Sequence, residues 1–211
     1  MFNFLLTLHI IGGSISLIIG LVPIIAKKGG SLHKTTGRIF GLAMLLATFS
    51  GVALAVIHPN KLLFLVGLFS SYLVFAGLLP IRMLQGNQLS SIKKAMILPA
   101  VGMLLASAMI LFAIYNLALK NLEGVILMVF GSGLLFTSIA DYKWITRLTQ
   151  VSRSQLLSIH VGRIVGAYIA SCTAFLVVNE PLPMPLLNWF IANLVFVPVI
   201  VFWQRKLNTA S

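Results

Sequence analysis

The chain has 211 residues, of which 59% are hydrophobic and only 9% are charged, and its formal net charge is +12. Soluble domains carry roughly 25% charged residues, so this composition excludes a water-soluble globular fold. The positive charges stand in short connections between apolar runs, which favours contact with anionic lipid over nucleic-acid binding. We therefore expect an integral membrane protein whose general partner is the lipid bilayer.

Apolar runs long enough to cross a membrane fill nearly the whole sequence. A transmembrane helix needs about 20 mostly apolar residues, and Gly, Pro, Asn or charged residues separate one run from the next. Hydropathy therefore predicts an all-α polytopic bundle of about seven helices, forming a single transmembrane domain over residues 1–211. The expected helices cover residues 2–26, 39–58, 61–84, 95–116, 122–140, 156–178 and 186–204.

The cations of the connections are distributed unequally between the two sides of this bundle. Twelve Lys and Arg residues fall on the side of the C-terminus, whereas Lys61 and Lys120 fall on the other side and Arg163 lies within a helix. Cytoplasmic loops hold the excess of cations, which predicts an outside N-terminus, a cytoplasmic C-terminus and a location in a bacterial inner (plasma) membrane. Trp144 and the other two tryptophans lie near predicted helix ends, which is typical of interfacial aromatic residues.

An outer polar layer is predicted around His9. This residue shares a helix face with Gly13, Ser16 and Gly20, and transmembrane helices approach closely at such small residues. Asn193 of the last helix enters from the same side to a similar depth of about 10–12 Å, at about 1.5 Å per residue. Two roles for His9 stay open, a core histidine that donates a hydrogen bond to Asn193 or a hydroxyl, and a ligand. His58 is either interfacial or functional.

An inner polar layer is predicted at the cytoplasmic ends of three helices. His33 and Arg38 lead into the second helix, Asp141 ends the fifth, and His160 and Arg163 begin the sixth. Asp141 is one of only three acidic residues, and an ion pair with Arg38 or Arg163 would lower the cost of burying either charge. Alternatively, the arginines extend to lipid phosphates at the membrane surface.

Several motifs resemble those of an uncharacterised family of bacterial multi-pass inner-membrane proteins, a domain of unknown function. The resemblance covers nearly the whole chain. It implies a membrane-embedded architecture and points to the histidines, arginines and aspartate of the two polar layers, but it supplies no reaction. The matching motifs are His9-x-x-Gly12-Gly13, Lys28-Gly29-Gly30-x-x-His33-Lys34-x-x-Gly37-Arg38, Asp141, and His160-x-x-Arg163-x-x-Gly166-Ala167-Tyr168.

Three functions are compatible with these residues, and the sequence leaves open whether the protein is an enzyme. The preferred one is a membrane redox protein, in which His9 or His33 and also His160 bind haem b, arginines pair with its propionates, and a quinone is the electron partner. His9 and His160 are expected in opposite leaflets, so these two would not share one iron.

The second hypothesis is a divalent-metal hydrolase with zinc held by His33, His160 and Asp141. The third is a carrier or binding protein for an anion, a lipid headgroup or another small-molecule ligand. In this protein Arg38, Asp141, His160 and Arg163 form the binding site, and histidine titration couples the ligand to protons.

Overall fold

The computed structural model describes residues 1–85 and 92–209. Within these residues, seven helical spans are long and apolar enough to cross a membrane, which confirms the predicted multi-pass all-α class. The sidedness of the termini stays a prediction. The helices are α1 (Phe2–Ile25), α2 (Ser31–Ile57), α3 (Lys61–Leu84), α4 (Ile92–Ala95), α5 (Ile97–Ala118), α6 (Glu123–Thr146), α7 (Arg153–Asn179) and α8 (Pro185–Thr209), with a 3₁₀ turn at Leu148–Gln150.

The two largest errors in the predicted helix boundaries both concern the inner polar layer. Helix α2 begins at Ser31 rather than at residue 39, and α6 ends at Thr146 rather than at residue 140. His33, Arg38 and Asp141 therefore lie inside helices, not in the segments that flank them. The physical reason is that hydropathy marks only the part of a helix that is apolar, whereas a helix continues through polar residues until its backbone hydrogen bonds end.

The chain forms two compact units. Unit 1 comprises Met1–Val74 and Ile164–Ile200, and unit 2 comprises Phe75–Arg163 and Val201–Ser211. Three helices, α3, α7 and α8, pass from one unit into the other, so each unit contains one part of each of these helices. The single domain predicted over 1–211 stays a prediction, and the interactions below are those within each unit.

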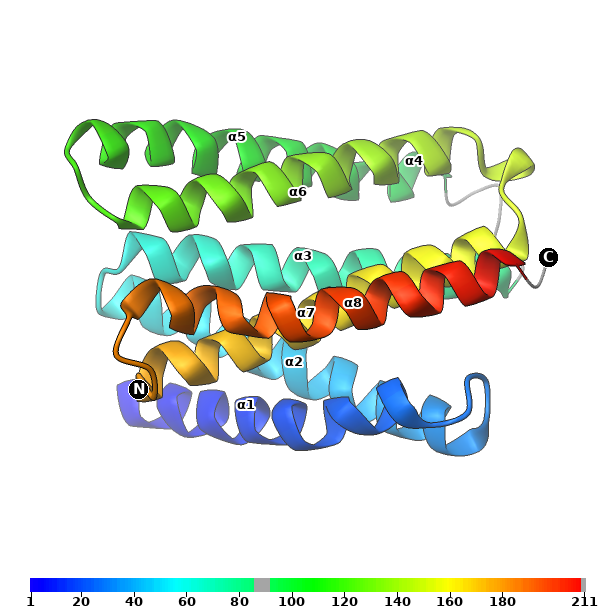
Figure 1. The fold of residues 1–211 in the computed structure, drawn as a ribbon, viewed down its shortest axis with the longest axis horizontal. Coiled ribbons are helices and arrows are strands. Elements are labelled where there is room, and N and C mark those ends of the chain that lie inside the picture. The colour runs from blue at the N-terminus through cyan, green and yellow to red at the C-terminus, as the bar shows by residue number, and fades with distance from the viewer. Residues whose placement is uncertain (86–91, 210–211) are drawn as a thin grey trace. The chain divides into compact units, whose positions relative to one another are not determined.

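In unit 1, α1 and α2 run side by side as a helical hairpin (Figure 1). Gly12 allows the close approach, because a Cβ atom there would lie 2.8 Å from the carbonyl oxygen of Ala43. A Cβ at Gly13 would meet nothing within 4 Å. The small face that contacts α2 thus contains Gly12, and its predicted assignment to Gly13 was wrong. Gly20 packs in the same way against the rings of Phe40 and Tyr168.

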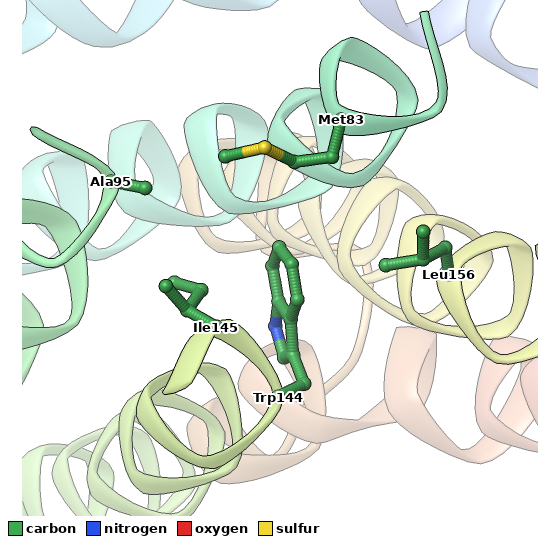
Figure 2. Close-up of a cluster of buried hydrophobic side chains, with 5 residues drawn as sticks. All are labelled: Met83, Ala95, Trp144, Ile145 and Leu156. Carbon is green, nitrogen blue, oxygen red and sulfur yellow. The ribbon is translucent and has the colours of Figure 1, made fainter. Parts of the chain in front are cut away.

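In unit 2, α5 and α6 form a second close hairpin (Figure 1). A Cβ at Gly124 would lie 2.8 Å from the backbone nitrogen of Leu117, and one at Gly131 would lie 3.0 Å from Met109. A cluster of buried apolar residues joins α3, α4, α6 and α7, and the indole of Trp144 extends into the space between these helices (Figure 2). The cluster consists of Met83, Ala95, Trp144, Ile145 and Leu156.

Candidate functional site

An ion pair between α6 and α7 is the principal polar feature of unit 2. Arg163 Nη2 donates to Asp141 Oδ1 at 2.9 Å, and Arg163 Nε donates to Asp141 Oδ2 at 3.3 Å, so the guanidinium contacts both carboxylate oxygens. The side chains of Arg163 and Asp141 are 13% and 2% exposed. The predicted pairing of Asp141 with an arginine is therefore confirmed for Arg163, whereas Arg38 is exposed on α2.

Two further groups form hydrogen bonds with this pair. Trp144 Nε1 donates to Asp141 Oδ1 at 3.0 Å, and Arg163 Nη2 also donates to the backbone carbonyl of Thr137 at 3.2 Å. A buried ion pair is tolerated when such additional hydrogen bonds satisfy its remaining polar atoms. Trp144 is 7% exposed, so its indole packs inside unit 2, and its depth in the membrane stays a prediction. The signal that sequence reasoning missed is its position three residues after Asp141, on the same helix face.

Ser138 lies on α6 in the turn between Thr137 and Asp141. Its residue exposure is 0%, and its hydroxyl oxygen is buried without a hydrogen-bond partner. Residues three apart on a helix are surface neighbours, so Ser138 and Asp141 share the buried face of α6. The sequence analysis did not select this serine, because serine is a common residue in membrane helices and only the structure distinguishes an unpaired hydroxyl from a paired one.

His160 precedes Arg163 by one turn of α7 and bonds to a different helix. Its Nδ1 lies 2.7 Å from the backbone carbonyl oxygen of Gly77 in α3. A carbonyl oxygen only accepts hydrogen bonds, so Nδ1 must carry the proton. Pro80 lies further along α3, but the amide that a proline removes there would bond to the Ala76 carbonyl and not to that of Gly77. His160 thus adds a hydrogen bond between α7 and α3 to a carbonyl that already has its own helical donor.

In unit 1, His9 also donates to a backbone carbonyl. Its Nδ1 lies 2.8 Å from the carbonyl oxygen of Ala47 in α2, and a Cβ at Gly51 would lie only 3.0 Å from the imidazole Cε1. Gly51 therefore makes room for the ring. The prediction that His9 is a core histidine is supported, but its partner is a carbonyl and not Asn193 or a hydroxyl.

His33 and Lys28 together cap the C-terminus of α1. His33 Nδ1 lies 3.0 Å from the carbonyl oxygen of Pro23, which also accepts from Lys28 Nζ at 2.7 Å. Lys28 Nζ donates to Ile24 O at 2.6 Å as well. Cations at a helix C-terminus satisfy its last carbonyls and the helix dipole. Burial lowers the pKa of the Lys28 amine from 10.5 to about 8.

Two residues of the predicted outer layer, Ser16 and Asn193, have surroundings of their own. Ser16 Oγ forms a 2.8 Å hydrogen bond with Ser171 Oγ of α7. Asn193 is half-buried on α8. The fully buried asparagine of α8 is Asn188, 2% exposed, whose side chain bonds to the backbone of Leu182. His9 and Ser16 thus bond to a backbone carbonyl and a hydroxyl of neighbouring helices, and the grouping of His9 with Asn193 stays a prediction.

His58 ends α2 and is exposed. Its ring forms an edge contact with Phe2, with ring centroids 4.5 Å apart. An exposed histidine against an aromatic ring near a helix terminus is typical of the interfacial role, one of the two that the sequence left open for it.

The donor groups fit a metal centre poorly. Across the part of the chain that the structure describes, no three His, Cys, Asp or Glu side chains gather to hold a metal ion, and Asp141 is bonded to Arg163 and Trp144. The expected zinc site is therefore not supported. The haem pairing of His9 or His33 with His160 stays a prediction, because His9 and His33 belong to unit 1 and His160 belongs to unit 2.

Comparisons with known proteins provide no independent assignment. The chain matches no protein-family model, no curated protein and no solved structure. The resemblance to an uncharacterised membrane family stays a prediction.

Proposed function

We propose that this protein is a proton-coupled carrier that binds an anion at Arg163. The buried ion pair of Arg163 with Asp141 is the observation on which this proposal rests. Ionisable groups within a transmembrane bundle are costly, and they mark ion and substrate paths. A buried ion pair is also weak evidence for stability, because apolar residues of similar volume are often as stabilising. A functional role accounts for the pair better than a structural role does.

The pair couples an anion to a proton by charge balance. In the resting protein, Asp141 neutralises Arg163. When a proton binds to the Asp141 carboxylate, the guanidinium is left with one uncompensated positive charge, and an incoming anion restores neutrality. Anion and proton therefore bind together, and Asp141 returns to Arg163 when both leave.

This proposal is tested by anion uptake into proteoliposomes with a pH gradient as the driving force. Labelled pyruvate, sulfate and chloride are offered separately to the protein, to Arg163→Ala and to Arg153→Ala. Arg153 is an exposed arginine at the start of the same helix, so it controls for the loss of a positive charge. We expect at least one anion to enter with the parent protein and with Arg153→Ala, but not with Arg163→Ala. Uptake that Arg163→Ala leaves unchanged contradicts the proposal.

A second candidate, a haem- or quinone-linked membrane redox protein, is favoured by the histidine tautomers. His9, His33 and His160 each donate Nδ1–H to a backbone carbonyl. Histidines that ligate a metal hold the second ring nitrogen in this way, so in each imidazole Nε2 is the nitrogen suited to iron. An absorption spectrum of the purified, air-oxidised protein tests this candidate. A Soret band that His160→Ala abolishes supports it, and a sample without the band after haem supplementation contradicts it.

We also propose the orientation that the distribution of cations indicates, with the N-terminus outside and the C-terminus in the cytoplasm of a bacterial inner membrane. Single cysteines at Lys61 and Lys93 in a Cys172→Ser background test it. We expect an impermeant thiol reagent, added to intact spheroplasts, to label the cysteine at position 61 and not the one at position 93. The reverse pattern overturns the orientation.

A further inference from the structure

We infer that the anion bound at Arg163 is a small monocarboxylate, that the Ser138 hydroxyl donates to it, and that it binds with one proton on Asp141. This inference rests on the proposed carrier function. It adds the substrate class, the second contact and the stoichiometry. The observations that carry it are the buried, unpartnered hydroxyl of Ser138 and the two-point contact of Arg163 with a carboxylate.

Ser138 differs from most helical hydroxyls of this protein. Ser50, Ser70 and Thr137 each donate to a carbonyl one turn earlier, which is the usual solution within a membrane helix. For Ser138 that carbonyl belongs to Leu134, and it already accepts the hydroxyl of Thr137 at 2.9 Å. In an α-helix it also accepts the Ser138 amide, so both of its lone pairs are used. The Ser138 hydroxyl is left available to a ligand.

Ser138 lies on the turn of α6 that the guanidinium contacts. Arg163 Nη2 contacts both the Thr137 carbonyl and Asp141 Oδ1, so the guanidinium extends along the turn of α6 that includes Ser138. Ser138 and Asp141 share the buried face of that turn. An anion that replaces the Asp141 carboxylate on Arg163 therefore lies next to a buried donor that has no other partner.

The class of anion follows from what Arg163 now binds. Its Nε and Nη2 contact the two oxygens of a carboxylate, and the fork of a guanidinium matches that planar group. Once Asp141 is protonated, the pair carries a single positive charge, which one negative charge neutralises. The balanced step takes one carboxylate and one proton from solution, breaks the Arg163 to Asp141 ion pair, and forms an Arg163 to ligand ion pair beside a neutral Asp141. No net charge moves.

The other ionisable groups near Asp141 leave this charge balance intact. His160 of α7 donates to the Gly77 carbonyl of α3. Of the remaining ones on these helices of unit 2, Glu123 at the first position of α6 is half-buried, and the others are exposed: Arg82 on α3, Lys93 and Lys94 on α4, Tyr142 and Lys143 on α6, Arg153 on α7, and Arg205 and Lys206 on α8.

The test measures labelled pyruvate uptake into proteoliposomes, with sulfate and chloride as alternative substrates. An inward proton gradient is applied with the membrane potential clamped at different values. We compare Ser138→Ala and Ser138→Thr with Ser132→Ala, an exposed serine of the same helix. We expect pyruvate uptake that is driven by the pH gradient and insensitive to potential. Ser138→Ala should raise the apparent KM about tenfold, as expected for a lost hydrogen bond to a charged group, and Ser138→Thr should restore it in large part.

Asp141→Asn separates the proton from the anion, because an amide imitates the protonated acid. We expect this variant to exchange labelled for unlabelled pyruvate across the membrane, but to lose accumulation driven by the pH gradient. If the variant does not fold, the Ser138 series and the dependence on potential still decide the question, since neither needs a change at Asp141.

The outcomes distinguish this inference from the function on which it rests. If no anion depends on Arg163, the carrier function itself is wrong. If uptake depends on Arg163 but the anion is sulfate or chloride, or if pyruvate uptake follows the membrane potential, only the substrate class or the stoichiometry is overturned. A KM for Ser138→Ala equal to that for Ser132→Ala overturns the second contact.

Discussion

The α1/α2 hairpin of unit 1 and the α6/α7 pair of unit 2 both bury polar side chains, but they satisfy them in different ways. In the hairpin, His9, His33 and Lys28 all donate to backbone carbonyls. In the α6/α7 pair, Arg163 binds a side chain of opposite charge. A carbonyl belongs to the helix and cannot leave, whereas a carboxylate can be neutralised by a proton and replaced by another anion. The bonds to carbonyls hold two helices together, whereas the ion pair is suited to the exchange of one anion for another.

The largest effect that tests this comparison is expected at Asp141. Asp141→Ala leaves the Arg163 charge buried without its partner, and breaking a buried pair in this way costs about 3–5 kcal/mol of stability. The double variant Asp141→Ala/Arg163→Met removes both charges and should recover most of that loss. The measurement is the unfolding of the purified variants in mixed micelles at increasing denaturing detergent.

A double-mutant cycle contains the control for this prediction. If Asp141→Ala and Arg163→Met have independent effects that add in the double variant, the two side chains are not coupled. The 2.9 Å contact would then contribute little to the free energy of unfolding. The α6/α7 pair would no longer differ from the α1/α2 hairpin in depending on a coupled ion pair.

A smaller effect is expected where α1 contacts α2. Gly12→Ala places a methyl group 2.8 Å from the carbonyl oxygen of Ala43 and 2.9 Å from the amide nitrogen of Ala47, and neither backbone atom moves easily. Overpacking of this kind costs about 1–3 kcal/mol. Gly13→Ala is the matched control, because its methyl group meets nothing within 4 Å. It should be neutral or slightly stabilising, since alanine favours a helix.

Thermal unfolding of the two variants in the same detergent measures this difference. Equal melting temperatures for Gly12→Ala and Gly13→Ala would mean that the hairpin is not packed through Gly12. The hydrogen bond from His9 to the Ala47 carbonyl would then be the main contact between α1 and α2. The two helices of unit 1 would be held together by hydrogen bonds and not by packing.

The sequence predicted the helices better than their ends. Long apolar runs located all seven spans, because only a helix satisfies its own backbone in lipid. The start of α2 at Ser31 was missed, since the turn that holds His33 and Lys34 is polar and hydropathy does not register it. The same limit placed Asp141 at the end of a helix that continues to Thr146.

For the candidate site, the sequence predicted the ion pair but not its surroundings. Asp141 was conspicuous because the chain has only three acidic residues, and an acid in lipid needs a cation. The acceptors of His9, His33 and His160 were not predictable, since a backbone carbonyl is the same at every position of a sequence. Ser138 and Trp144 also needed the structure, because their roles depend on which neighbouring acceptor is already occupied.

The smallest expected effect concerns the cap of α1. The pKa of Lys28 is lowered to about 8, and burial is the cause. Between about pH 8 and the unfolded value of 10.5, the unfolded chain therefore binds more protons at this lysine than the folded protein does. The contribution of Lys28 to stability rises with pH across that window. The rise is small, because much of the side chain is in contact with solvent.

Carbon NMR of protein labelled at the lysine Cε carbons measures this titration directly. We expect the Lys28 resonance, assigned by its loss in Lys28→Gln, to titrate with a midpoint near pH 8. If it titrates instead at the ordinary lysine value of 10.5, Lys28 is solvated like any surface lysine. The hydrogen bonds of Lys28 to Pro23 and Ile24 would then contribute little to stability. Of the three donors His9, His33 and Lys28, only the two histidines would stabilise the hairpin.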